Sequence, residues 1–174
     1  YNHNVPVYLT EAQIKQKVKE LAAEITKEFG DEEVTVIGTL KGSFVFLADL
    51  IRELKMPTRI EFLGVSSYGD QTHSSGEVKV TLDLTAPLND KNVVLVEDIV
   101  DTGKTLSEFL PQLISQGPAS LKVAALLHKP DALVHKLQLD YVGFNVPNKF
   151  LLGFGLDYDG LGRNLKEIYQ LTEG

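Results

Sequence analysis

The sequence contains no cysteine, and this absence excludes several kinds of chemistry at once. Disulfide bonds, thiolate nucleophiles and cysteine-based zinc sites all require the missing side chain. A chain without disulfide bonds suits a reducing compartment, and we therefore expect the protein to be cytoplasmic.

Basic residues are outnumbered by acidic ones. Lys and Arg total 17 against 24 Asp and Glu, which gives a formal net charge of -7. Proteins that bind nucleic acids carry a basic patch or stripe, so we expect no nucleic-acid partner. A small anionic ligand is still compatible with this charge, because backbone amides and a metal ion can reverse the local field.

Long apolar runs, internal repeats and low-complexity linkers are missing as well. Because a membrane-spanning helix needs roughly 20 apolar residues, we expect no membrane partner. The 174 residues are 43% hydrophobic and 24% charged, which is ordinary for a globular protein. We expect a single domain over residues 1–174.

The spacing of apolar residues predicts alternating helices and strands. Thr10 and Gln13 have the spacing of a capping box, and apolar residues then recur at helical intervals up to Phe29, before Gly30. Apolar stretches predict strands, and amphipathic stretches predict helices between them. Strands are expected near 34–38, 59–67, 78–84, 92–98, 120–127, 140–144 and 150–155, with further helices near 43–54 and 105–116. This order predicts an α/β fold with a central, mostly parallel sheet flanked by helices.

Polar clusters follow three of these strands. Ligands of parallel sheets bind outside the carboxyl ends of the strands. Residues 98–105, Lys41 with Gly42, and Lys129 all come just after a predicted strand. We expect them to line one edge of the sheet.

The stretch "VVLVEDIVDTGKTL", residues 93–106, combines acids with a possible phosphate-binding turn. It is not a P-loop, because that motif needs a glycine five residues before Gly103 and the sequence has Asp98 there. The segment "GFGLDY" is not a dinucleotide-binding motif either, because Tyr158 replaces its third glycine.

The turn after this strand still has the groups that bind a phosphate monoester. Its amides and hydroxyls lie at the start of a predicted helix, where the backbone favours anions, and Gly103 permits a sharp bend. The residues of this predicted site are Asp101, Thr102, Gly103, Lys104 and Thr105. Glu97 and Asp98 suit the two hydroxyls of a ribose or a bridging metal ion, and Asp101 suits proton transfer.

Several segments together resemble one family. "VVLVEDIVDTGKTL" is similar to the phosphoribosyl-pyrophosphate signature of the type I phosphoribosyltransferases, and most of all to their 6-oxopurine branch, the hypoxanthine/guanine phosphoribosyltransferases. "TLKGSFVFLADL", "SSYG", "LLHKP" and "VGFNVPNKFLLGFGLDYDGLGRNL" match in the same order. The resemblance runs from about Val34 to Leu165. It implies a type I phosphoribosyltransferase fold with a small hood from the N- and C-terminal segments, a flexible lid loop at about 67–79, and a homodimer or homotetramer.

The resemblance also implies an activity. The family transfers the phosphoribosyl group of 5-phosphoribosyl 1-pyrophosphate to hypoxanthine or guanine in purine salvage, with Mg2+ as cofactor. Two alternatives stay open: a transferase that prefers xanthine, and a regulatory protein of the same fold that has no catalytic activity.

Site residues follow from the same resemblance. In the family, residues 101–105 hold the 5-phosphate, and Glu97 with Asp98 faces the ribose hydroxyls. Asp101 exchanges a proton with the purine, and Lys129 donates to its 6-oxo group. The base would be contacted by Ile99, Phe150 and Leu151, and the pyrophosphate would be bound by Lys41, Gly42 and Arg163. The lid would begin at Ser67 and Tyr68. The metal ion would be bound by Asp157 together with Glu97 and Asp98. A cis peptide bond is expected between Leu40 and Lys41.

One feature departs from the family pattern. Many members carry an arginine a few residues after the lysine that reads the 6-oxo group. Here "KPDALVHK" has none, and His135 and Lys136 are the only basic candidates nearby.

Each of three predicted site residues also has an ordinary structural interpretation. Asp101 could be a helix N-cap. Lys129 could be a solvated loop residue, and Phe150 could be part of the core.

Overall fold

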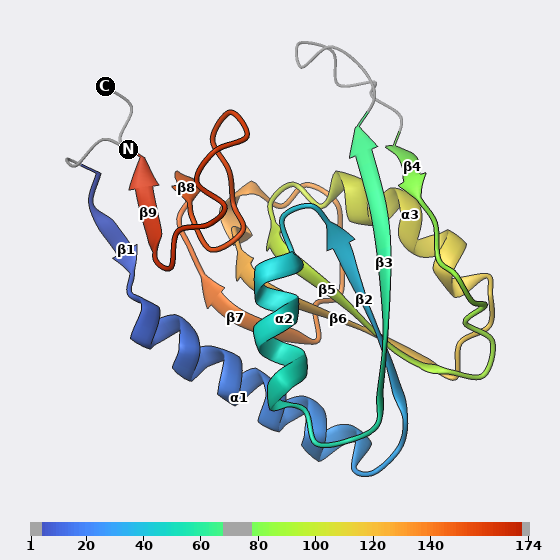
Figure 1. The fold of residues 1–174 in the computed structure, drawn as a ribbon. Coiled ribbons are helices and arrows are strands. Elements are labelled where there is room, and N and C mark those ends of the chain that lie inside the picture. Colours follow the sequence, from blue (N-terminus) through green and yellow to red (C-terminus); the bar gives the residue numbers. More distant parts are fainter. Residues whose placement is uncertain (1–4, 68–77, 172–174) are drawn as a thin grey trace.

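The computed structural model describes residues 5–67 and 78–171, which form a large and a small sheet with helices packed around them (Figure 1). The strands of the large sheet, in spatial order, are β4 (Val78–Leu82), β3 (Thr58–Ser67), β2 (Val34–Leu40), β5 (Asn92–Val100), β6 (Ser120–His128) and β7 (Tyr141–Asn145). All neighbours are parallel except β4, which runs antiparallel to β3 at one edge. This is the mostly parallel sheet that the sequence predicts.

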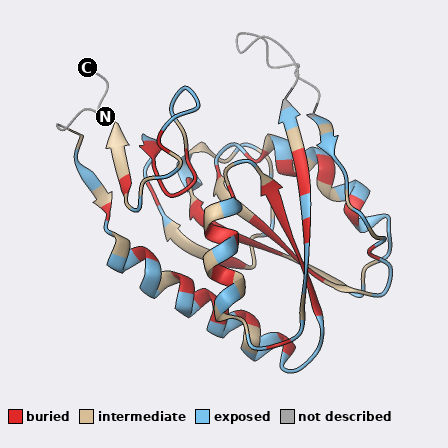
Figure 2. Cartoon of the chain, viewed as in Figure 1, coloured by how far each residue is buried: buried red, intermediate tan, exposed pale blue. Residues whose placement is uncertain are grey.

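Helices cover both faces of this sheet. One face carries α1 (Glu11–Phe29) and α2 (Phe44–Glu53), and the other carries α3 (Lys104–Ile114), while a short 3-10 turn, η1 (Pro130–Ala132), follows β6. Figure 2 shows that each helix is buried along the side that faces the sheet and exposed along the opposite side.

Strand β5 shows why a continuous apolar run forms the centre of such a sheet. Val94 and Val96 belong to the core beneath α1 and α2, whereas Val93 and Leu95 belong to the core beneath α3. All four side chains are fully buried, and each contributes roughly 1.5–3 kcal/mol by leaving water. The run is therefore apolar at every position, because successive residues of a strand point to opposite faces.

Helix α1 begins and ends where the sequence predicts. Thr10 is its N-cap, its hydroxyl accepts the Gln13 N–H at 3.2 Å, and the Gln13 side chain accepts the Thr10 N–H at 2.8 Å. Gly30 closes the helix at φ 61°, which an L residue rarely adopts. The predicted capping box and stop are confirmed.

The small sheet joins the two terminal segments of the described chain. It contains β1 (Val7–Leu9), β9 (Ile168–Leu171) and β8 (Phe150–Leu152) in that order, all antiparallel. We call it the terminal sheet. The strand predicted over residues 150–155 is shorter than expected, because Gly153, Phe154 and Gly155 all have positive φ and turn the chain away after Leu152.

The helices can be compared with a membrane-spanning segment by their length and apolar character. Within residues 5–67 and 78–171, no helix combines the length and apolar character that crossing a bilayer requires.

Candidate active site

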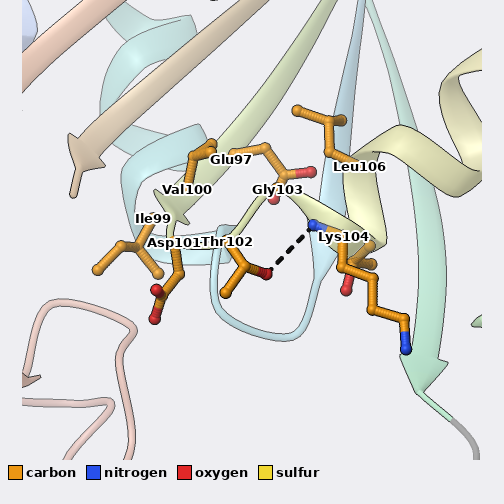
Figure 3. A pocket seen from close by; sticks show the side chains of 9 residues that line it. Glu97, Ile99, Val100, Asp101, Thr102, Gly103, Lys104 and Leu106 are labelled. Atoms are coloured by element: carbon orange, nitrogen blue, oxygen red, sulfur yellow. Dashed lines mark hydrogen bonds between the residues drawn. The ribbon is translucent and has the colours of Figure 1, made fainter. Parts of the chain in front are cut away.

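The turn between β5 and α3, residues 101–105, is built to expose backbone amides. Gly103 is the N-cap of α3 at φ 83°, and it has no side chain with which to accept the first helical N–H groups. The Lys104 N–H donates to the Thr102 hydroxyl at 3.3 Å (Figure 3). The amides of a first helical turn lack intrahelical acceptors and favour an anion. The turn borders a pocket lined by Glu97, Ile99, Val100, Asp101, Thr102, Gly103, Lys104, Thr105 and Leu106.

A second segment supports this turn from behind. The Thr102 carbonyl accepts the N–H groups of Val134 and His135, at 2.9 and 3.0 Å. A Cβ on Gly103 would lie 2.8 Å from the Leu137 side chain and 3.2 Å from the His135 carbonyl. Glycine is therefore required at residue 103 both by its φ and by this close packing.

The contact of His135 with Thr102 shows which basic residue lies near the turn in place of the arginine that many family members carry after the equivalent of Lys129. His135 lies against the turn through its backbone and is half-buried, whereas Lys136 is exposed. The structure thus brings the His135 backbone to the site.

Asp101 and Lys129 lie side by side at the ends of β5 and β6. The Lys129 ammonium is 3.5 Å from Asp101 Oδ2, and the Lys129 N–H donates to the Val100 carbonyl at 3.0 Å. Lys129 is only 8% exposed, so it is not the solvated loop residue of the ordinary interpretation. Asp101 is not a helix N-cap either, because Gly103 has that position. The buried ammonium can donate hydrogen bonds to polar atoms along one edge of a ligand, and the half-exposed carboxylate can accept them.

The adjacent acids Glu97 and Asp98 diverge. Glu97 lines the pocket beside the turn, and the hydroxyl of Thr39 donates to its Oε2 at 2.7 Å. Asp98 instead lies against Gly42, where an added Cβ would collide with Asp98 Oδ2. The two carboxylates therefore reach different parts of the site, although they are neighbours in the sequence.

Both carboxyls have raised pKa values. Burial raises the pKa of Glu97 to about 8; the charge of Asp98 adds to the rise, and the hydrogen bond from Thr39 opposes it. Burial raises the pKa of Asp98 to about 6; backbone hydrogen bonds and then the Arg163 guanidinium oppose the rise, and the Asp157 charge adds to it. Crowded carboxylates of this kind favour a bound cation.

Residues 40–42 form the turn that leads from β2 into α2. The Leu40–Lys41 peptide bond is cis, as the resemblance implies. Gly42 is in close contact with a third segment as well, because a Cβ on Gly155 would collide with the Gly42 carbonyl. The predicted pyrophosphate residues Lys41 and Gly42 thus share a location with Asp98.

Arg163 and Asp157 belong to the loop after β8, residues 153–163. Arg163 donates to the Gly155 carbonyl at 2.6 Å, and its guanidinium is 3.3 Å from Asp157 Oδ1. Asp157 Oδ2 also accepts the Gly160 N–H at 2.9 Å. Gly155 in turn touches Gly42, so loop 153–163 brings Arg163 and Asp157 to the same side of the site as Asp98.

The predicted base-contacting residues have different exposures. Phe150 is 48% exposed, so the core interpretation of this side chain is wrong, whereas Leu151 is buried. The ring of Tyr158 packs edge-on against Phe150, with centroids 5.6 Å apart and planes at 87°. Ile99 lines the pocket with Asp101, and Figure 3 shows both side chains on the same side of the turn.

Two predictions stay untested by this geometry. Ser67 is the last residue of β3, and Tyr68 with most of the predicted lid lies outside the described residues. In the described part of the chain, no group of three or more Asp, Glu or His side chains converges in a way that could hold a metal ion by itself.

Sequence patterns missed three residues of this site. Thr39 binds Glu97, Gly155 packs on Gly42, and Tyr158 packs on Phe150. None of the three had a local signal in the sequence, because each contact depends on how separate segments pack together.

Comparison with known proteins agrees with this geometry. A family model described as the phosphoribosyl transferase domain matches residues 7–159. The chain belongs to the phosphoribosyltransferase family. The resemblance found in the sequence is confirmed, and so is the predicted fold class.

Named relatives cover almost the whole phosphoribosyltransferase chain. The hypoxanthine-guanine phosphoribosyltransferase of Aquifex aeolicus is 45% identical over 166 residues, which span 95% of this chain and 93% of the relative. The crystal structure of a hypoxanthine-guanine phosphoribosyltransferase from Bacillus anthracis, with HEPES in its active site, is 42% identical with a TM-score of 0.92, covering 96% of this chain and 98% of the other. A hypoxanthine phosphoribosyltransferase from Trypanosoma cruzi is 38% identical with a TM-score of 0.92, covering 99% and 94%.

Proposed function

We propose that this phosphoribosyltransferase transfers the phosphoribosyl group of 5-phosphoribosyl 1-pyrophosphate to hypoxanthine or guanine, and so serves purine salvage. The nucleotide and pyrophosphate are the products. The observation that carries the proposal is the pair formed by buried Lys129 and Asp101, 3.5 Å apart, directly beside the amide-rich turn 101–105. The names of the relatives support the same activity.

The Lys129–Asp101 pair fits one edge of a 6-oxopurine. In such a base the oxo group and a ring nitrogen are neighbours on one edge. Lys129 donates to the oxo group, and Asp101 exchanges a proton with the adjacent ring nitrogen. The attacking nitrogen is the other one in the five-membered ring, so its lone pair stays free to form the bond to the sugar.

Turn 101–105 and Glu97 hold the ribose 5-phosphate part of the substrate. The phosphate binds the backbone amides and hydroxyls of the turn at the start of α3. Glu97 lines the same pocket, and its carboxylate faces the ribose hydroxyls. The sugar is thereby fixed at two ends, which orients its reacting carbon toward the base.

The pyrophosphate side consists of Lys41, Gly42 and Arg163. As the glycosidic carbon–oxygen bond breaks, negative charge develops on the departing pyrophosphate. Arg163 offers a planar set of N–H donors for this charge, and the Gly42 backbone permits close approach.

The acids of the site fit a magnesium ion that arrives with the substrate. Asp98 and Asp157 would supply carboxylate oxygens, the donors that Mg2+ prefers, on the pyrophosphate side, and Glu97 would supply one on the ribose side. Asp157 is close enough to Asp98 for its charge to raise the pKa of Asp98. Mg2+ is commonly held by one or two carboxylates together with substrate phosphates. When bound, it neutralises the charge of the pyrophosphate.

We also propose a lid over the site, a homo-oligomeric assembly and a cellular compartment. The lid that the resemblance implies would begin at Ser67 and Tyr68 and would keep water away from the reacting sugar. A homodimer or homotetramer forms through the apolar surface of α2 and β3, where Phe44, Ile60 and Phe62 are about two-fifths exposed. The cysteine-free sequence suits the cytoplasm.

A nucleotide-formation assay tests the proposal. The protein is incubated with 5-phosphoribosyl 1-pyrophosphate, Mg2+ and one purine at a time, and the product is followed by its absorbance. Hypoxanthine and guanine are expected to react, and adenine is not, because its amino group leaves Lys129 without an acceptor. A higher kcat/KM for xanthine would correct the base assignment. Substrate binding without turnover of any purine would support a regulatory protein instead.

A further inference from the structure

Thr39, at the end of β2, makes hydrogen bonds within the site, although the proposed mechanism assigns it no part. Its side chain is buried, with the residue 5% exposed, and its hydroxyl donates to Glu97 Oε2 at 2.7 Å. The Val96 carbonyl lies 3.3 Å from the same hydroxyl. A short hydrogen bond between two buried groups restricts both side chains, because leaving either partner unpaired is costly. The contact therefore holds the Glu97 side chain in place.

The backbone of Thr39 holds a second part of the site. Its carbonyl accepts the Ser43 hydroxyl at 2.6 Å and the Ser43 N–H at 3.3 Å, and Ser43 is fully buried. The three residues between them, 40–42, form the predicted pyrophosphate turn. Thr39 thus joins that turn to the carboxylate of Glu97, which comes from another strand.

We propose that Thr39 is a positioning residue for the phosphoribosyl substrate, holding Glu97 so that its second carboxylate oxygen faces the ribose hydroxyls. The inference rests on the proposed function, and it adds a residue to the ribose side of that site. Glu97 lines the pocket beside the phosphate-binding turn, and its Oε2 is already bound to Thr39. The other oxygen is left for the substrate. Without the hydroxyl, the carboxylate could turn to other rotamers.

Thr35 provides a natural comparison on the same strand. It is buried to the same degree, at 3% exposed, yet its hydroxyl has no hydrogen-bond partner among the described residues. Burial on β2 therefore does not by itself produce the contact that Thr39 makes. A Thr→Val substitution at either residue removes one hydroxyl and keeps the shape of the side chain.

The test compares Thr39→Val, Thr39→Ser and Thr35→Val in steady-state kinetics, with each substrate varied in turn and thermal unfolding measured in parallel. Thr39→Val is expected to raise KM for 5-phosphoribosyl 1-pyrophosphate about tenfold. Its KM for the purine base should change by less than about twofold, because Lys129 and Asp101 are untouched. Thr39→Ser should restore the original KM, and Thr35→Val should leave both KM values unchanged.

Several results would overturn the proposal. They are an unchanged substrate KM in Thr39→Val, an equal rise in both KM values, or an equal effect of Thr35→Val. If Thr39→Val does not fold, Thr39→Ala and Thr39→Ser give the same contrast between absence and presence of the hydroxyl.

Calorimetric binding of 5-phosphoribosyl 1-pyrophosphate with Mg2+ separates this inference from the proposed function. An unmodified protein that binds this compound but turns over no purine would refute the proposed function alone. Weaker binding by Thr39→Val would then still support the role of Thr39, and equal binding would refute it.

Discussion

Turn 101–105 and loop 153–163 both supply the site, but they are held in different ways. The turn lies between a strand and a helix that are adjacent in sequence, and its supports are the buried β5 and the Thr102 contacts with residues 134–135. The loop has positive φ at Gly153, Phe154, Gly155, Asp159, Gly160 and Gly162. Its contacts with the rest of the site include the close approach of Gly155 to Gly42. The turn is thus placed by the strand and helix beside it and braced by residues 134–135, whereas the loop is closed by its own hydrogen bonds, such as that from Arg163 to the Gly155 carbonyl, and meets Gly42 at Gly155.

The largest effect is expected from Asp101→Asn in the turn. Asparagine keeps the shape but cannot exchange the proton, so kcat should fall about 10²- to 10⁴-fold. Binding of 5-phosphoribosyl 1-pyrophosphate should change little, since the phosphate is held by the turn amides. Single-turnover kinetics and calorimetry measure the two quantities. Asp131→Asn, an exposed acid nearby, is the control, and equal losses of turnover and binding would contradict a proton-transfer role.

Gly103→Ala tests how tightly the turn is packed. The added Cβ meets the Leu137 side chain at 2.8 Å and must adopt φ 83°, so we expect kcat/KM to fall about 100-fold through displacement of the phosphate amides. Gly117→Ala is a matched control, because Gly117 has φ 74° but nothing within 4 Å of the new Cβ. The control should lose stability and keep its kinetics. Equal kinetics in the two variants would show that the turn tolerates displacement.

Arg163→Lys tests the loop half. Lysine keeps the charge but cannot bind the Gly155 carbonyl and Asp157 with one planar group, so KM for 5-phosphoribosyl 1-pyrophosphate should rise about tenfold. Arg59→Lys changes an exposed ion pair with Glu33 and should have no measurable effect. A rise in KM for the base alone would place Arg163 on the wrong side of the site.

Tyr158→Leu addresses the contact between the loop and the exposed Phe150. Removal of the edge-on ring should raise KM for the purine about fivefold, because aromatic pairs of this kind are worth roughly 1 kcal/mol. Tyr158→Phe keeps the ring and should behave like the unmodified protein. If both variants weaken base binding equally, the hydroxyl and not the ring is responsible.

Glu97→Gln should raise thermal stability while it lowers activity. Because the pKa of Glu97 rises from 4.5 to about 8 on folding, its favourable contribution is complete below about pH 4.5 and is lost as the pH rises toward 8. Gln carries no charge, so in the absence of Mg2+ the variant should melt about 10 °C higher at pH 9, with little difference at pH 5. Melting curves at both pH values test this, and an equal difference at both would exclude the titration of Glu97 as the cause.

Sequence reasoning reached the parts of the fold that local chemistry decides. The capping box at Thr10, the stop at Gly30 and the continuous apolar residues of β5 each have a cause within a few residues of the chain. The turn after β5 is of the same kind, which is why its place between strand and helix was predictable.

The contacts between distant segments could not be predicted in this way. Nothing near Thr39 indicates that its hydroxyl meets Glu97, and nothing near Gly42 indicates that Asp98 and Gly155 close around it. The divergence of Glu97 and Asp98 follows from the opposite directions of successive strand residues, but the partners of each depend on the packing of other elements. The exposure of Phe150 likewise depends on where loop 153–163 folds.

The terminal sheet determines which parts of the structure can form first while the chain is being translated. Its middle strand, β9, is the last described strand to be made, yet both β1 and β8 pair with it. The parallel sheet and turn 101–105 can assemble while the ribosome is still translating, since chains fold from their N-terminal side as they emerge. Phe150 gains its strand partner only after residues 168–171 have left the ribosome, so turn 101–105 and the Asp101–Lys129 pair can form before Phe150 is fixed in its strand.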